Sequence, residues 1–143
     1  DDVGFPRYQR MLRELPDTVF LGHAMHFWAE ISGDVTADQI TGYPKGPIAP
    51  GGTVPMMLNT YPNLYGDISA GSGYNALTRD PAFGYRFLEE FQDKLVLGTD
   101  ICRLDQDMLI VPYLKDALAT GKISQAAFTK ITRTNAEKIL RLA

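Results

Sequence analysis

The chain has 143 residues, of which 45% are hydrophobic and 22% are charged, and this composition is typical of one ordinary globular domain. The net charge of −3 comes without a block of one sign, so it favours a small-molecule partner over nucleic acid or an anionic membrane. A single cysteine, Cys102, excludes an internal disulfide framework and a thiolate-rich metal site, and it suits a cytoplasmic location. No stretch approaches the roughly 20 apolar residues of a membrane span, and no secretory leader pattern opens the sequence.

A helix, a turn and a short strand recur three times along the chain. The segments LPDTVFLGH, YPNLYGDIS and FQDKLVLGTD are three versions of the same turn and strand, and each follows an amphipathic or apolar run at helical spacing. The predicted helices cover residues 7–15, 54–61 and 81–91, and the predicted strands cover residues 18–21, 64–69 and 95–98.

The strands read as continuous apolar runs between helices of about ten residues, which favours parallel strands covered by helices and therefore an α/β fold. Each strand is followed by a polar residue: His23, Ser69 and Asp100. Parallel sheets and barrels bind their ligands at the carboxyl ends of the strands. We therefore expect these three residues to lie together at one end of the sheet.

The rest of the chain divides into a long connection and a helical end. Residues 28–53 are rich in Gly and Pro without a sustained period, so this stretch is predicted to be a lid or, alternatively, a loop without function. An Asp-rich loop at 101–108 precedes a predicted helix over 109–120. A final helical stretch over 124–142 is expected to bend or divide near Thr132–Thr134.

Asp100 and His23 are the main candidates for chemistry. Asp100 is either a turn or helix-capping residue, or a carboxylate that binds a cation or takes a proton from bound water. His23 and His26 would share a face if their segment were helical, and two imidazoles on one face could bind a metal. The alternative places His23 at the end of the strand and His26 in the following loop.

Other polar and aromatic residues allow a binding or a structural interpretation. The stretch Ser69–Gly73 lacks the spacing of a phosphate-binding loop or of a serine-hydrolase elbow, so a tight turn that lets substrate approach the backbone is favoured. Arg103 is the best candidate to bind a substrate carboxylate at the rim. Trp28, Tyr43 and Tyr74 either line a pocket for a planar substrate or pack in the core.

The segments DDVGFPRYQRMLRELPDTVFLGHAMHFWAE, YPNLYGDISAGSGYNALTRDPAFGYRFLEEFQDKLVLGTD and TRTNAEKILRL together resemble the metal-dependent amidohydrolase superfamily, specifically amidohydrolase family 2. The resemblance implies the C-terminal part of a (β/α)8 TIM barrel, with Zn²⁺ or a similar divalent ion at its mouth. By the same resemblance Asp100 follows the eighth strand as a metal ligand and proton acceptor. His23 follows the sixth strand, where it binds metal or polarises the substrate.

The chain also departs from the family pattern. No His-x-His and no fifth-strand ligand are present, since only two histidines occur. Three units cannot close a barrel of eight. Because catalytic zinc sites usually have three protein ligands, we expect metal binding by Asp100 and His23 in this chain alone to be weak or absent. Two unpaired sheet edges would favour association with an N-terminal half of the barrel or with a second copy.

The resemblance implies hydrolysis of a small amide, ester or lactone carbonyl by a metal-bound hydroxide. The expected site residues are Asp100 and His23 for catalysis and metal binding, and Trp28, Ser69, Tyr74 and Arg103 for substrate binding. A nonoxidative decarboxylase on the same scaffold and a non-catalytic interaction module are the alternatives.

Overall fold

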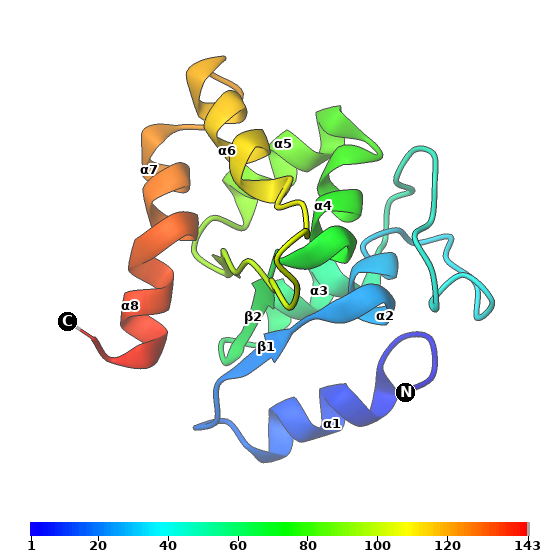
Figure 1. The fold of residues 1–143 in the computed structure, drawn as a ribbon. Coiled ribbons are helices and arrows are strands. Elements are labelled where there is room, and N and C mark those ends of the chain that lie inside the picture. The colour runs from blue at the N-terminus through cyan, green and yellow to red at the C-terminus, as the bar shows by residue number, and fades with distance from the viewer. Residues whose placement is uncertain (143) are drawn as a thin grey trace.

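The computed structural model describes residues 1–142 and confirms the predicted alternation of helices and parallel strands (Figure 1). Most elements begin and end within two residues of their predicted bounds. In chain order the elements are α1 (Pro6–Glu14), β1 (Phe20–Gly22), α2 (Ala24–Ala29), α3 (Thr53–Thr60), β2 (Leu64–Asp67), α4 (Ala70–Thr78), α5 (Pro81–Glu90), β3 (Leu95–Val96), α6 (Ile110–Ala119), α7 (Gln125–Thr129), the π-helix η1 (Lys130–Thr134) and α8 (Asn135–Leu140).

The three strands form one parallel sheet in the order β1-β2-β3. Leu21 pairs with Tyr65, and Asp67 pairs with Val96, so these side chains share one face of the sheet. The opposite face carries Gly66, where an added Cβ would lie 3.1 Å from the Trp28 ring. The absence of a side chain at Gly66 therefore lets the indole pack directly on β2, and the α/β class is confirmed.

Two helices were not predicted. α2 follows β1 directly, and α4 follows β2, where the sequence Ala-Gly-Ser-Gly favoured a turn because glycine weakens helices. Packing explains the second case, because a Cβ at Gly73 would lie 2.4 Å from the carbonyl oxygen of Ile68. The glycine therefore permits a close contact between α4 and the end of β2 that outweighs its poor helix propensity.

The outer edge of β3 is covered by the end of the chain, so the expectation of two unpaired sheet edges is wrong there. The backbone N–H and carbonyl groups of Leu95 and Leu97 point away from β2, because the carbonyls of Lys94 and Val96 accept from β2 and the residue after it. The amide of Asn135 donates to the carbonyl of Leu95 at 2.7 Å, and Leu97 N–H donates to the carbonyl of Ile131 at 2.9 Å. The predicted division of the last helix is confirmed by η1, in which Ile131 lies.

A buried asparagine fastens α1 to the sheet. Asn63 immediately precedes β2, and its amide nitrogen donates to the carbonyls of Leu12 at 3.1 Å, Leu15 at 3.0 Å and Thr18 at 3.1 Å. These are carbonyls at and beyond the end of α1, which have no partner within the helix. The side chain therefore fixes the path by which the chain leaves α1 and enters β1.

Hydrogen bonds join the two ends of the long connection to each other. Gly33 N–H donates to the carbonyl of Ala49 at 3.0 Å, and Ala49 N–H donates to Ser32 Oγ at 2.8 Å. The distal part reaches α4, since a Cβ at Gly71 would lie 3.1 Å from the Tyr43 hydroxyl. The lid interpretation of this segment stays a prediction.

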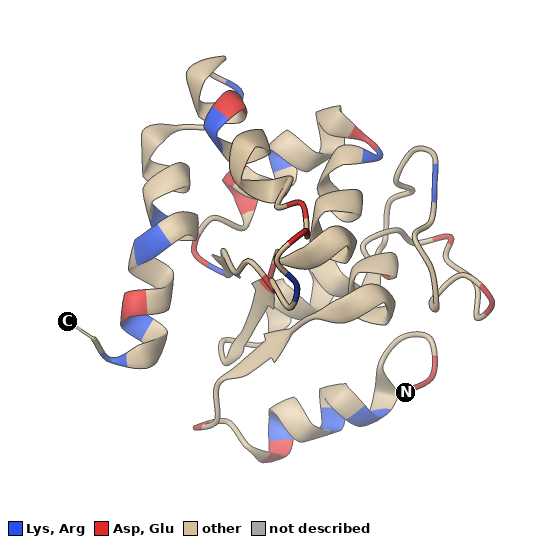
Figure 2. Cartoon of the chain, viewed as in Figure 1, with Lys and Arg blue, Asp and Glu red and all other residues tan. Residues whose placement is uncertain are grey.

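Charged residues are scattered over helices and loops without a continuous block of one sign (Figure 2). Within residues 1–142, none of the helices combines the length and the apolar character needed to cross a bilayer.

Asp80 joins the long connection to α5, and its replacement is expected to destabilise the protein. One carboxylate oxygen accepts from Ile48 N–H and the other from Phe83 N–H, both at 3.1 Å. These bonds lower the pKa of Asp80 below its ordinary value, and the bond from Ile48 has a larger effect than the bond from Phe83. Asp80→Ala should lower the free energy of unfolding by about 1 kcal/mol at neutral pH, as expected for a lost helix cap.

This difference should depend on pH. Because the folded pKa is depressed, the carboxylate stabilises the fold above its unfolded pKa of about 3.9, and that contribution is lost as the pH falls through the folded value. Urea denaturation of the wild type and of Asp80→Ala, at neutral pH and below about pH 3, measures the difference in unfolding free energy at each pH. Asp17→Ala, an exposed aspartate before β1, is the control. A difference between wild type and Asp80→Ala that stays constant with pH would contradict the role of the ionised carboxylate.

Candidate functional site

Three polar side chains meet at the carboxyl ends of the neighbouring strands. His23 directly follows β1, Asp67 is the last residue of β2, and Asp100 lies four residues beyond β3. His23 Nδ1 lies 3.1 Å from Asp67 Oδ2, and His23 Nε2 lies 3.9 Å from Asp100 Oδ2. The imidazole is thus placed between two carboxylates, one on each ring nitrogen.

Asp67 is held by several groups around it. The hydroxyl of Ser69 donates to Asp67 Oδ2 at 2.9 Å, and the N–H of Ser69 donates to Asp67 Oδ1 at 3.0 Å. Ser69 Oγ also lies 3.3 Å from His23 Nδ1. The indole N–H of Trp28 donates to the Asp67 carbonyl at 2.8 Å. These contacts fix both the carboxylate and its backbone, so Asp67 is positioned to orient the His23 ring.

The backbone is strained at the same place in each unit. Ala24, Ala70 and Asp100 have positive φ values of 72°, 60° and 52°, and they follow His23, Ser69 and Thr99 respectively. A left-handed conformation costs a non-glycine residue about 1–2 kcal/mol and is tolerated better by aspartate than by alanine. The repeated conformation confirms that the three units are built alike. Asp100 precedes no helix, so the interpretation of Asp100 as a helix cap is wrong.

The geometry suits part of a metal site. A metal-binding histidine usually donates its second ring N–H to a carboxylate, and Asp67 is placed to accept from Nδ1 while Nε2 faces Asp100. The side chains of His23 and Asp100 are 36% and 54% exposed, which leaves both accessible. Catalytic zinc usually takes three protein ligands, and among residues 1–142 no three His, Cys, Asp or Glu side chains are arranged to hold a metal. The donors that are present therefore fit an incomplete site.

His26 makes other contacts. It lies within α2, and its Nε2 is 2.9 Å from an oxygen of the fully buried Glu30, whose other oxygen accepts from Gly4 N–H at 2.8 Å. The ring also packs against Phe5, with 4.4 Å between the centroids. The segment is helical as the two-histidine hypothesis required. However, these contacts tie His26 to the beginning of the chain, and its nitrogen faces a carboxylate other than those around His23.

The predicted substrate-binding residues lie at different depths. Ser69 is at the centre of the site, and Trp28 is buried beneath it with its N–H bonded to Asp67. Tyr74 is half-buried in α4 and packs edge-to-face on Tyr113. Arg103 is exposed, and its Nε lies 3.6 Å from Asp105. Their contacts with substrate stay predictions.

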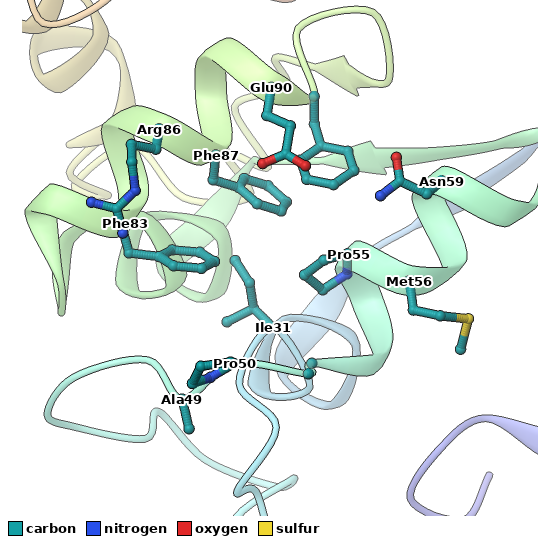
Figure 3. A pocket seen from close by; sticks show the side chains of 13 residues that line it. Ile31, Ala49, Pro50, Pro55, Met56, Asn59, Phe83, Arg86, Phe87 and Glu90 are labelled. Atoms are coloured by element: carbon teal, nitrogen blue, oxygen red, sulfur yellow. The ribbon is translucent and has the colours of Figure 1, made fainter.

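A hollow of about 190 Å³ adjoins Asp67 on the same face of the sheet. Its lining is mostly apolar and consists of Leu21, Val96, Leu97, Gly98, Ala136, Ile139 and Leu140 in addition to Asp67. Another hollow, of about 270 Å³, lies between α3 and α5 (Figure 3). Arg86 and Glu90 are its charged residues, and neither histidine borders it. The strand ends are therefore the better candidate for chemistry.

Asp67 is the residue that the sequence analysis missed. The predicted second strand includes Asp67, but the sequence pattern points to Ser69 as the functional residue at the end of that strand. The available signal was a carboxylate within the otherwise uncharged segment LYGDIS. In the structure β2 ends at Asp67, which makes this residue the terminal side chain of the strand.

Comparison with known proteins places this arrangement of residues in a family of enzymes. No curated protein and no solved structure matches the chain. A family model described as amidohydrolase matches residues 8–142, which is nearly the whole sequence. The match agrees with the resemblance carried by the repeated strand ends, and the chain belongs to amidohydrolase family 2.

Proposed function

We propose that the intact protein is a metal-dependent hydrolase that acts on the carbonyl of a small amide, ester or lactone. His23 and Asp100 supply two of the ligands of a divalent metal ion. Zinc is the expected ion. The observation that supports this most directly is the placement of one imidazole between Asp67 on Nδ1 and Asp100 near Nε2, at adjacent strand ends. Membership of the amidohydrolase family independently points to an enzyme of metal-dependent hydrolysis or decarboxylation.

A bound divalent ion polarises a carbonyl and lowers the pKa of water. In the proposed reaction Asp100 accepts the proton of the attacking water, because its carboxylate is exposed and is engaged by no donor among residues 1–142 other than His23. Asp67 holds the Nδ1 proton of His23, so Nε2 remains free to bind the ion or to stabilise charge on the substrate. Ser69 fixes Asp67 through its hydroxyl.

The substrate is proposed to enter through the hollow beside Asp67. Its mostly apolar lining suits the body of a small organic molecule, while the reacting carbonyl faces the polar strand ends. Ser69 and Tyr74 line the approach in this proposal, Trp28 supports it from below, and Arg103 attracts a substrate carboxylate from the rim. The exposed thiol of Cys102 is compatible with the proposed cytoplasmic location.

We also propose that the three units are the C-terminal portion of a (β/α)8 barrel. The free edge is that of β1, where the side chain of Leu21 is exposed on the sheet face opposite Trp28. An N-terminal portion of the barrel or a second copy of the chain would cover this edge and supply the remaining metal ligands. Light scattering tests the association, and a monodisperse monomer of this chain would contradict it.

The function itself is tested by loading the intact protein with zinc and assaying panels of amides, esters, lactones and carboxylated substrates. Hydrolysis that a chelator abolishes and zinc restores is the expected result. Chelator-sensitive release of CO2 would instead identify the decarboxylase alternative. No turnover and no zinc binding by calorimetry would favour the non-catalytic interaction module.

A further inference from the structure

A half-buried arginine at the far end of α4 has one guanidinium nitrogen without an acceptor among the described residues. Arg79 directly follows α4, whose other end follows Ser69, so the nine-residue helix places it about 13 Å from the strand ends. Its Nη2 is buried and has no hydrogen-bond acceptor among the described residues. A buried donor is costly unless it is bonded, so this nitrogen favours an acceptor supplied from outside the described residues.

The guanidinium borders a small polar cavity of about 40 Å³ between α4 and the long connection. This volume exceeds the roughly 10–15 Å³ that a single water requires. The lining consists of Ser32, Asp34, Val35, Gln39, Pro44, Lys45, Pro47 and Arg79. Two of its charged groups are positive and one is negative, so the lining carries a net charge of +1 at neutral pH.

The neighbouring carboxylates bond to other groups, Asp80 through both oxygens and Asp34 through one. Asp80 uses one oxygen for Ile48 N–H and the other for Phe83 N–H. Asp34 accepts from the Ser32 hydroxyl at 2.6 Å. Neither forms an ion pair with Arg79 within residues 1–142, although both are near enough to favour its charged form. Burial has the larger effect and lowers the pKa of Arg79, but a guanidinium remains protonated in proteins.

We propose that this cavity binds a singly charged planar oxyanion, either the carboxylate of a small molecule or an inorganic ion such as nitrate or bicarbonate. The planar guanidinium matches such an anion through two parallel N–H donors. A lining charge of +1 suits one negative charge, while Asp34 disfavours a second. The small cavity limits the ligand to a group of a few atoms.

The bound anion would fasten the long connection to α4. Lys45 and Ser32 belong to the connection, whereas Arg79 belongs to the end of α4, so one anion contacts both. The part of the connection between residues 34 and 47 is otherwise joined mainly by local bonds such as that from Gln39 N–H to the Thr36 carbonyl. Occupation of the site should therefore reduce opening of this segment.

Limited proteolysis of the full chain with trypsin tests the site, because Lys45 is exposed within the segment and is followed by glycine. Formate, acetate, nitrate and bicarbonate are compared with sulfate and chloride at constant ionic strength. At an anion concentration ten times its Kd, cleavage after Lys45 is expected to slow about tenfold, since only the unoccupied protein opens. Cleavage after Lys122, an exposed lysine in the turn before α7, serves as the internal reference and should not change.

Arg79→Met should abolish the protection, whereas Arg86→Met, at an exposed arginine of α5, should retain it. If Arg79→Met does not fold by circular dichroism, Arg79→Lys replaces it and should bind more weakly because the two-pronged contact is lost. Protection by formate and acetate alone identifies a small-molecule carboxylate, and protection by nitrate or bicarbonate identifies an inorganic ion. Equal effects of sulfate and chloride, or unchanged protection in the Arg79 variants, would overturn the proposal.

Discussion

Asp100→Asn in the intact protein is expected to lower kcat by about 10²–10⁴-fold, as the loss of a proton acceptor does in other enzymes. The substitution keeps the size of the side chain but removes its basicity and its negative charge. Asparagine also tolerates the left-handed conformation that Asp100 adopts at φ 52°, so the backbone should be unchanged. The exposed side chain forms no stabilising core contact, and the thermal midpoint should therefore stay close to that of the wild type.

Steady-state kinetics and metal analysis on the same samples separate the two roles of Asp100. Lower kcat with lower zinc content indicates ligand loss, whereas lower kcat at full zinc content indicates loss of the proton acceptor. Asp105→Asn is the matched control, because Asp105 is an exposed aspartate in the same loop and pairs with Arg103. Unchanged turnover of Asp100→Asn would remove Asp100 from the proposed mechanism.

The repeated units made part of the site predictable. The sequence pattern predicts that His23, Ser69 and Asp100 follow equivalent strands. In the structure the residues after His23 and Ser69 are left-handed, and in the third unit Asp100 itself is left-handed. The prediction worked because hydrophobic runs and turn residues are local signals. The contact between β1 and β2 follows from the parallel arrangement once the strands are recognised.

Other features depend on contacts between distant segments. Gly73 weakens a helix locally, yet α4 forms because that glycine permits contact with Ile68. Asn135 appears in the sequence as an ordinary polar residue of the last helix, but it covers the outer edge of β3 by bonding to Leu95. Asp67 acquires its position through the pairing of β2 with its neighbours. No periodicity or motif in one sequence reports such tertiary hydrogen bonds.

The site also depends on the core beneath it. Trp28 belongs to α2, and its indole lies against Gly66 on one side of β2. Through its N–H it holds the Asp67 carbonyl, while the Asp67 carboxylate on the same residue faces His23. The packing of α2 and the orientation of the imidazole are therefore coupled through one strand end.

Trp28→Ala should lower the free energy of unfolding by about 3–5 kcal/mol, as truncation of a buried aromatic residue does. The side chain is 2% exposed and packs edge-to-face against Phe27 and Phe87 with centroid separations of 5.2 and 6.3 Å. Its removal leaves a cavity beside β2 and deprives the Asp67 carbonyl of its donor. Urea denaturation followed by circular dichroism measures the change. Tyr43→Ala is the control, because that aromatic side chain is exposed.

Trp28→Phe separates packing from the hydrogen bond. Phenylalanine fills most of the cavity but donates no hydrogen bond, so it should recover much of the stability while leaving the Asp67 carbonyl without this partner. If Trp28 acts through Asp67, the phenylalanine variant of the intact protein should show reduced kcat with little change in KM. A raised KM with unchanged kcat would instead indicate direct substrate contact, because uniform binding energy would have been removed. Stability of Trp28→Ala equal to that of the wild type would contradict the core role altogether.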